Sequence, residues 1–223
     1  MIVLVAHGTR DPEGPRAIAL LARRVRARGV PVAVAYADVR APDVTTVLDR
    51  VRGPAVVVPA FLAAGYHVRT DVPAQIAASR NGDAVLAKPF GPAPELVAAA
   101  ADRLSQAGHT PGDAVVLAAA GSRDPRALAD VGTAARSLAG RLGAPVRVGY
   151  AATAEPRITD AVAAVRAGGA RVAVASWLLA PGLFQRRLAE AAPDVLAEPI
   201  GAHQAVVDLV LRRYAEARAL VRA

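Results

Sequence analysis

Short, fully apolar runs alternate along this chain with longer segments in which apolar residues recur every three or four positions. The run at 2–6 contains no polar residue, whereas Ile18, Leu21 and Val25 mark one helical face within 13–28. A continuous apolar run is typical of a strand that is buried on both faces of a parallel sheet. Spacing of three and four residues predicts an amphipathic helix.

The same alternation continues through the first half of the chain. It predicts strands at 2–6, 32–36, 55–58 and 84–87, helices at 13–28, 42–51 and 94–106, a loop at 59–71 and a short helix near Pro73. Alternation of strands and helices is typical of a parallel sheet with helices on both faces. We therefore expect an α/β fold.

The second half of the chain repeats the first. The phrase from Val3 to Pro12 recurs from Val115 to Pro125, with Ala120 where His7 stands. Further matches follow in the same order, pairing 146–150 with 32–36, 155–156 with 41–42, 172–178 with 56–62 and 196–201 with 86–91. The repeat predicts two homologous lobes, 1–108 and 113–223, joined by a turn-rich linker at 109–112. Each lobe should hold a four-stranded parallel sheet, and the lobes should face each other across a cleft.

Composition narrows the classes of partner. None of the 223 residues is cysteine, which excludes disulfides and thiolate metal sites. The net charge of +8 comes almost wholly from arginine, and it fits either a compositional bias that aids solubility or an anionic partner. The arginines are scattered without interleaved aromatic residues, so a small polycarboxylate fits better than nucleic acid. The densest group fits the solvated face of a helix, and it comprises Arg23, Arg24, Arg26 and Arg28.

Targeting signals are missing from the sequence. The N-terminus begins with a predicted strand and lacks the regions of a signal peptide. No uncharged apolar run reaches the roughly 18 residues that span a bilayer. We expect a soluble cytoplasmic protein without a membrane partner.

Two of the four histidines are predicted to meet. His7 ends the first strand, and His67 lies in the loop after the third strand. Because the carboxyl ends of parallel strands share one edge of a sheet, both side chains should reach the same rim. The second lobe keeps the surrounding residues but has Ala120 and Phe184 at these two positions. Loss of both imidazoles from one copy indicates a shared role that one lobe performs.

The other candidate polar residues fit structural roles. His109 lies in the linker, and His203 precedes the last predicted helix. Thr9 with Asp11, and Ser122 with Asp124, are expected to cap helices.

A pair of imidazoles is sparse for a permanent metal site, because structural zinc usually has four ligands. A weak and open site is suited to passing a metal ion onward. Neutral imidazole also accepts protons near neutral pH. A pair that binds a divalent ion and takes protons from an incoming chelator favours metal insertion.

The segments 4–12 and 59–73, read together, resemble the CbiX/SirB family of class II tetrapyrrole chelatases. The resemblance implies a lyase of the two-lobe form that inserts Co²⁺ or Fe²⁺, with Ni²⁺ as a further candidate, into sirohydrochlorin. Such a reaction belongs to cobalamin or sirohaem biosynthesis. The metal is then a substrate, and no organic cofactor is implied.

The same resemblance assigns roles to single residues. His7 and His67 correspond to the metal-contacting catalytic histidines. Asp38 stands where relatives carry a glutamate, and its shorter reach leaves its place among the metal ligands open. The remaining residues would bind the carboxylates or faces of the tetrapyrrole, namely Arg10, Phe61, Gly65, Tyr66, Arg69 and Arg123.

Two rival functions stay open. A non-catalytic carrier of a tetrapyrrole or metal would need the same pocket. A phosphohistidine-type phosphatase is a weaker alternative. Such enzymes have the sequence Arg-His-Gly at the first strand, whereas Ala6 precedes His7 here. A chain that carries both lobes is expected to be a monomer.

Overall fold

The computed structural model describes residues 1–222, which form two compact units. Unit 1 comprises Met1–Phe90 and the segment from Ala202 onward, and unit 2 comprises Gly91–Gly201. Within the described residues, no helix is both long enough and apolar enough to cross a membrane.

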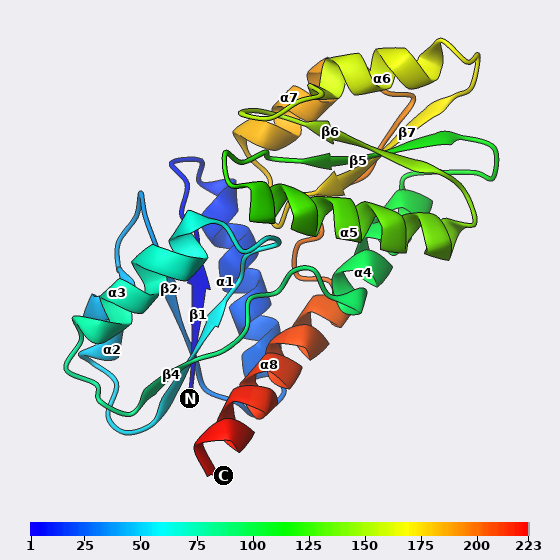
Figure 1. Cartoon of the computed structure of the whole chain (residues 1–223). Helices are drawn as coiled ribbons and strands as arrows, with labels where there is room; N and C mark the ends of the chain where they lie inside the picture. Colours follow the sequence, from blue (N-terminus) through cyan, green and yellow to red (C-terminus); the bar gives the residue numbers. More distant parts are fainter. Residues whose placement is uncertain (223) are drawn as a thin grey trace. The chain divides into compact units, whose positions relative to one another are not determined.

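Unit 1 is built on a parallel sheet of strand order β2-β1-β3-β4 (Figure 1). Its strands are β1 (Ile2–Ala6), β2 (Val32–Tyr36), β3 (Ala55–Pro59) and β4 (Ala84–Leu86). Ile2 on the central strand pairs with Val32 on one side and with Val56 on the other. Strands β1 and β3 are buried along their whole length, as their apolar runs predict.

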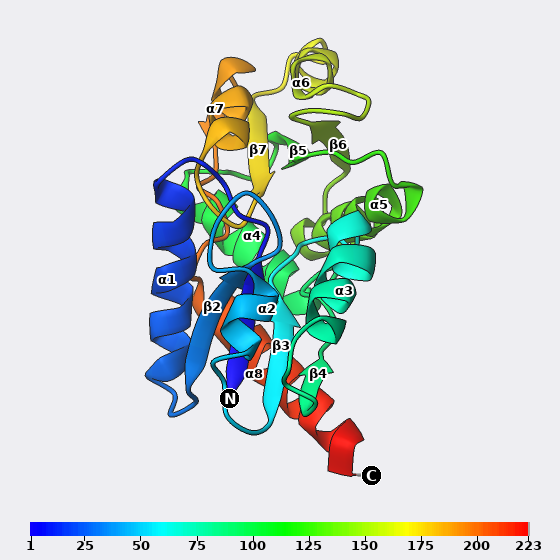
Figure 2. The ribbon, with the colours of Figure 1, turned by 90° about the vertical axis from the view of Figure 1, so that its left-hand side faces the viewer.

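Helices cover both faces of this sheet (Figure 2). One face carries α1 (Glu13–Arg26) and α8 (Gln204–Arg222), and the other carries α2 (Val44–Leu48) and α3 (Val72–Ala77). A single turn of π-helix, η1 (His67–Asp71), leads directly into α3. The α1 residues Ile18, Leu21 and Val25 are buried, as their spacing predicts.

Unit 2 has the same architecture, with strand order β6-β5-β7-β8. Its strands are β5 (Ala114–Ala119), β6 (Val146–Tyr150), β7 (Val172–Trp177) and β8 (Val195–Leu196). Helices α4 (Pro94–Gln106) and α5 (Pro125–Leu142) cover one face, and α6 (Ile158–Arg166) and α7 (Leu183–Glu190) cover the other. The predicted α/β class with two homologous parallel sheets is thereby confirmed. The predicted cleft stays a prediction.

The last helix of each sequence repeat packs on the sheet of the other repeat. Helix α4 ends the first repeat and contacts β7 and α5 of unit 2, whereas α8 ends the second repeat and contacts β3, β4 and α1 of unit 1. Arg213 fastens α8, because its Nε donates to the Pro89 carbonyl at 3.0 Å. The predicted boundary at 109–112 therefore separates the sequence repeats and not the compact units.

Strand register corrects one detail of the repeat. Val115 occupies the position of Ile2, and these residues pair with Ala173 and Val56 respectively. Trp177 therefore corresponds to Ala60, and the match of 172–178 with 56–62 is wrong by one residue. Successive strand residues point to opposite faces, so this shift reverses the face assigned to every side chain of the strand.

Candidate metal-binding site

The turn after β1 presents the first histidine. Gly8 has φ +98°, and a Cβ atom there would lie 2.0 Å from the Asp38 carbonyl oxygen. The neighbouring amide of Asp38 donates to the His7 carbonyl at 3.0 Å. Gly121 repeats this turn with φ +96° and a Cβ position 1.8 Å from the Ala152 oxygen. Both units thus keep the turn, but only unit 1 carries an imidazole directly before it.

The π-helix presents the second histidine. The segment was predicted as loop, but the Val72 amide donates to the His67 carbonyl five residues back. Val72 and Leu188 are both fully buried in their units. Five positions separate His67 from Val72, whereas four separate its counterpart Phe184 from Leu188, so a match of these two buried residues would give the first repeat one extra residue here. Such single π-turns occur frequently at functional sites.

The two imidazoles meet, as the topology predicts. The ring centroids of His7 and His67 are 4.4 Å apart, with an interplanar angle of 82°. The Phe61 ring lies 6.3 Å from that of His7, and the Tyr66 ring lies 6.1 Å from that of His67. Tyr66 is 61% exposed, so an aromatic face beside the pair is open to a ligand.

Hydrogen bonds assign the same tautomer to both rings. Nδ1 of His7 lies 3.0 Å from the Gly8 carbonyl oxygen, and Nδ1 of His67 lies 2.6 Å from Oδ2 of Asp71. A carbonyl and an ionised carboxylate can only accept, so each Nδ1 carries the proton in the neutral ring. Each Nε2 then offers its lone pair, and neutral imidazole is the form that binds metal ions.

The structure does not add Asp38 to the pair. Among residues 1–222, no three histidine, aspartate or glutamate side chains gather closely enough to hold a metal ion. Oδ1 of Asp38 instead accepts from the amide of Val39 at 2.7 Å. Within the described residues, Asp38 thus does not extend the histidine pair into a three-residue cluster.

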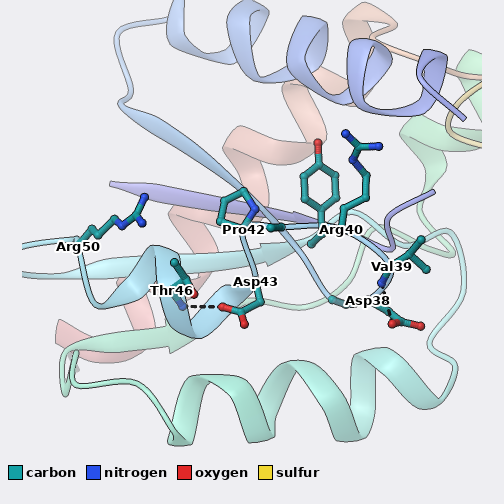
Figure 3. A pocket seen from close by; sticks show the side chains of 10 residues that line it. Asp38, Val39, Arg40, Pro42, Asp43, Thr46 and Arg50 are labelled. Carbon is teal, nitrogen blue, oxygen red and sulfur yellow. Dashed lines mark hydrogen bonds between the residues drawn. The ribbon is translucent and has the colours of Figure 1, made fainter. Parts of the chain in front are cut away.

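An open pocket of about 670 Å³ lies on the loop after β2 (Figure 3). Asp38 and Arg40 extend to opposite sides of this loop (Figure 3). Nη1 of Arg40 donates to the Thr9 carbonyl at 3.2 Å, and its guanidinium carbon lies 6.0 Å from the centre of the Tyr36 ring. Burial raises the pKa of Tyr36, and the positive charge of Arg40 partly opposes that shift.

Sequence reasoning did not single out Arg40. A comparison of the two repeats could have indicated it, because the register that matches Tyr36 with Tyr150 places Ala154 at the position of Arg40. The Asp38 position is likewise alanine, Ala152, in the second repeat.

The predicted substrate-binding residues divide between the two units. Arg10 and Arg69 are exposed in unit 1, the first directly after the His7 turn and the second within η1. Gly65 accepts the amide of Arg69 and donates to the Ala63 carbonyl. Arg123 is exposed in unit 2, after β5. Phe61 and Tyr66 flank the histidine pair, as described above.

The polar residues expected to be structural are structural. Oγ1 of Thr9 accepts from the Asp11 amide, and Asp11 accepts from Glu13 at the start of α1. Ser122 and Asp124 repeat this arrangement before α5. Nδ1 of His203 accepts from the Ala205 amide at the start of α8. The prediction for Ser122 and Asp124 is confirmed, because Asp124 is the N-cap of α5. The N-cap position of α1 is Pro12 and receives no side-chain hydrogen bond, so Thr9 and Asp11 shape the turn before that helix and do not cap it.

The basic side of α1 is largely bonded within unit 1. Arg24 donates to the Ala202 carbonyl, Arg26 donates to the Val32 carbonyl, and Arg28 pairs with Asp208. These partners give the cluster a structural role.

The fold and the site together define a duplicated α/β protein in which one repeat carries a histidine pair at the carboxyl edge of its sheet. The sequence model of the CbiX family matches residues 1–107 and 114–217. The chain therefore belongs to the CbiX family.

Solved structures share this fold over nearly the whole chain. SirB from Bacillus subtilis with Fe³⁺ is 24% identical, with a TM-score of 0.82 over 97% of this chain and 94% of that chain. SirB from Bacillus subtilis subspecies spizizenii in complex with cobalt is 23% identical, with a TM-score of 0.79 over the same shares. CbiX, described as the terminal enzyme for biosynthesis of siroheme in denitrifying bacteria, is 22% identical, with a TM-score of 0.72 over 97% and 98%. No curated protein sequence matches the chain.

Proposed function

We propose that this protein is a lyase that inserts a divalent metal ion, Co²⁺ or Fe²⁺, into sirohydrochlorin. The observation that carries the proposal is the convergence of His7 and His67, whose Nδ1 atoms are both engaged and whose Nε2 atoms are both available. Membership of the CbiX family supports it. The related proteins of similar fold include SirB structures with Fe³⁺ and with cobalt.

The chemistry requires an exchange of ligands and protons. The metal ion enters as substrate, and the Nε2 atoms of His7 and His67 hold it while water fills the other positions. Four ring nitrogens then replace these ligands, and two pyrrole protons leave the macrocycle. A neutral imidazole that releases the metal accepts a proton in its place. Two weak ligands suit this step, because a closed four-ligand site would retain the ion.

Residues around the pair would hold the macrocycle. Sirohydrochlorin carries many carboxylates, which the guanidinium groups of Arg10 and Arg69 would pair. Phe61 and Tyr66 would contact the flat ring, and Gly65 would allow the backbone to approach it. Asp38 lies outside this proposed ligand set.

The test is metal insertion by the purified protein, followed through the absorption spectrum of sirohydrochlorin with Co²⁺ or Fe²⁺. Wild-type protein should complete many turnovers. His7→Ala and His67→Ala should each lower the rate by about a hundredfold or more, the size of a lost acid–base or ligand group. His109→Ala removes a histidine from the linker and should leave the rate unchanged.

Two results would contradict the proposal. Metallation that stops at one equivalent per protein would indicate a carrier. Near-normal turnover by either site variant would remove that histidine from the reaction.

Two finer points belong to the same proposal. Two imidazoles accept cobalt, iron and nickel alike, so the metal that turns over fastest would indicate the cobalamin or the sirohaem pathway. One chain holds both repeats, which supports a monomer, and light scattering of the purified protein measures that directly.

A further inference from the structure

Asp71 stands at the start of a helix without capping it. It occupies the N-cap position of α3, yet its side chain accepts no capping hydrogen bond. Its own backbone is helical, with φ −73° and ψ −46°. The reason is that η1 runs into α3, so the Val72 amide already has the His67 carbonyl as its partner. An aspartate at this position would usually satisfy orphan amides, and here that role is absent.

The carboxylate of Asp71 is directed at His67 instead. Oδ2 lies 2.6 Å from Nδ1, a short separation for this class of bond. Both side chains are about one-third exposed, at 32% for His67 and 29% for Asp71. The contact therefore lies at the rim of the site, where a substrate has access.

The second repeat lacks both members of this contact. Phe184 replaces the histidine, and no acidic residue follows it before Glu190. Helix α7 nevertheless forms at the corresponding place in unit 2. The carboxylate is thus dispensable for building a helix after the third strand, and it is missing from the repeat that lacks the imidazole.

We propose that Asp71 is a positioning residue for metal insertion, an inference that rests on the proposed function. By accepting the Nδ1 proton, it fixes the tautomer of His67 and the rotation of its ring, so that Nε2 is directed at the metal ion. The two histidines are therefore inequivalent. A neutral backbone carbonyl orients His7, whereas a charged side chain orients His67, and only the second can be removed by substitution.

Contacts that do not involve Asp71 hold α3 in place. Gln75 of α3 accepts the Val44 amide at 3.0 Å and donates to the Ala37 carbonyl at 2.9 Å. Oγ1 of Thr45 donates to the Gln75 carbonyl at 2.8 Å. Removal of the Asp71 carboxylate should therefore leave η1 and α3 folded.

The first test is ¹⁵N–¹H nuclear magnetic resonance of the histidine side chains in the metal-free protein. Wild-type His67 should be in the Nδ1–H form. Asp71→Ala should convert it to a mixture dominated by the Nε2–H form, and Asp71→Asn should retain Nδ1–H because the amide oxygen still accepts. The spectrum of His7 should stay unchanged and serves as an internal control. An unaltered tautomer in Asp71→Ala would overturn the inference.

The second test is the affinity for Co²⁺ alone, measured by titration. Asp71→Ala should bind about 10–100-fold more weakly, the usual loss when the partner of a ligating histidine is removed. Asp71→Asn should lie between that variant and the wild type. Asp83→Ala removes an exposed carboxylate before β4 and should bind as the wild type does. Circular dichroism checks that each variant is folded.

The comparison with His67→Ala separates two kinds of failure. If His67→Ala loses Co²⁺ binding and both Asp71 variants retain it, the inference on Asp71 is wrong and the proposed function stands. If His67→Ala itself binds Co²⁺ normally, the metal site is wrong, and both proposals fail. Should Asp71→Ala not fold, the intermediate affinity expected of Asp71→Asn still decides the inference.

Discussion

At the scale of single residues, Gly8 shows how backbone geometry positions a functional side chain. Its φ of +98° belongs to the region that L-residues avoid, and its α-carbon faces the Asp38 carbonyl at a distance that admits no methyl group. Gly29 has a similar φ of +83° but has nothing within 4 Å of a Cβ position. Both glycines thus have a positive φ that would strain an L-residue, but only Gly8 is crowded.

Alanine substitution at these glycines separates the two effects. Gly29→Ala should lower the free energy of unfolding by about 1 kcal/mol, the cost of a left-handed alanine. Gly8→Ala should lower it by about 3 kcal/mol or more, because the clash adds to the strain. Urea denaturation measures both values. Equal losses of unfolding free energy in the two variants would show that the close approach to Asp38 adds nothing to the cost of Gly8→Ala.

The contribution of Asp43 to the stability of the folded state depends on pH. Its carboxylate caps α2 by accepting the Thr46 amide at 2.7 Å, and hydrogen bonding from Thr46 lowers its pKa below the ordinary value of 3.8. The folded state thus favours the charged form. The stabilisation is fully present above pH 3.8 and is lost as the pH falls through the lowered pKa.

We expect Asp43→Ala to cost about 1 kcal/mol of stability near pH 7, a typical value for a lost N-cap. The cost should shrink as the pH falls below the ordinary pKa of the carboxyl. Asp43→Asn keeps an acceptor without the charge, and the part of the pH dependence that Asp43 contributes should disappear in that variant. Urea denaturation at a series of pH values checks this, and a cost for Asp43→Ala that is constant down to pH 3 would refute it.

The histidine pair illustrates what sequence reasoning predicts at this scale. The topology of a parallel sheet placed His7 and His67 on one edge, and the repeat showed that both were absent from the second copy. Tautomers lay beyond reach, because they depend on which acceptor faces each Nδ1. The bond from His67 to Asp71 was missed for the same reason, although both residues were visible in the motif.

At the scale of elements, the π-turn was the feature that sequence patterns did not predict. Residues 67–71 lack a distinct apolar spacing, and an i to i+5 hydrogen bond leaves no compositional mark, so a loop was expected. The longer helices were predicted well, since α4 spans 94–106 as expected and α1 ends two residues before the predicted 28. Helix α2 is shorter than the helix predicted at 42–51, and it spans only Val44–Leu48.

Gln75 links α3 to the first residue of α2 and to the residue after β2, and its removal tests that link. Gln75→Ala should lower the free energy of unfolding by about 2–3 kcal/mol, because the variant leaves the Val44 amide and the Ala37 carbonyl without their partner. Hydrogen exchange at the Val44 amide should accelerate. Gln75→Glu retains the acceptor for Val44 and should protect that amide. Unchanged exchange in Gln75→Ala would show that water replaces the side chain without loss.

At the scale of the whole molecule, the exchange of α4 and α8 makes each repeat depend on the other for a complete fold. Amphipathic spacing showed that 94–106 and the last helix each bury a face, but it does not specify which sheet receives that face. The predicted lobes therefore followed the sequence repeat, whereas the compact units begin and end at 91 and 202. Hydrophobic patterning determines which face of a helix is buried, whereas the path of the chain determines which sheet buries it.

Cutting the chain at the linker should separate helices from their sheets. A fragment of residues 1–108 would hold the sheet of unit 1 without α8, and a fragment of residues 109–223 would hold the sheet of unit 2 without α4. We expect each fragment alone to lack a cooperative thermal transition, and an equimolar mixture to recover one. Circular dichroism during heating checks this. Two fragments that each melt cooperatively would show that the exchange is unimportant for stability.

The exchange also bears on how the duplication persists in evolution. A gene that lost its second half would lose α8, which packs on β3 and β4, so part of one face of the remaining sheet would be uncovered. We therefore expect substitutions that detach α8 to weaken the sheet that carries His7 and His67, although α8 lies more than a hundred positions further along the chain. The copy without the histidine pair would then be kept because its last helix completes the fold of the other copy.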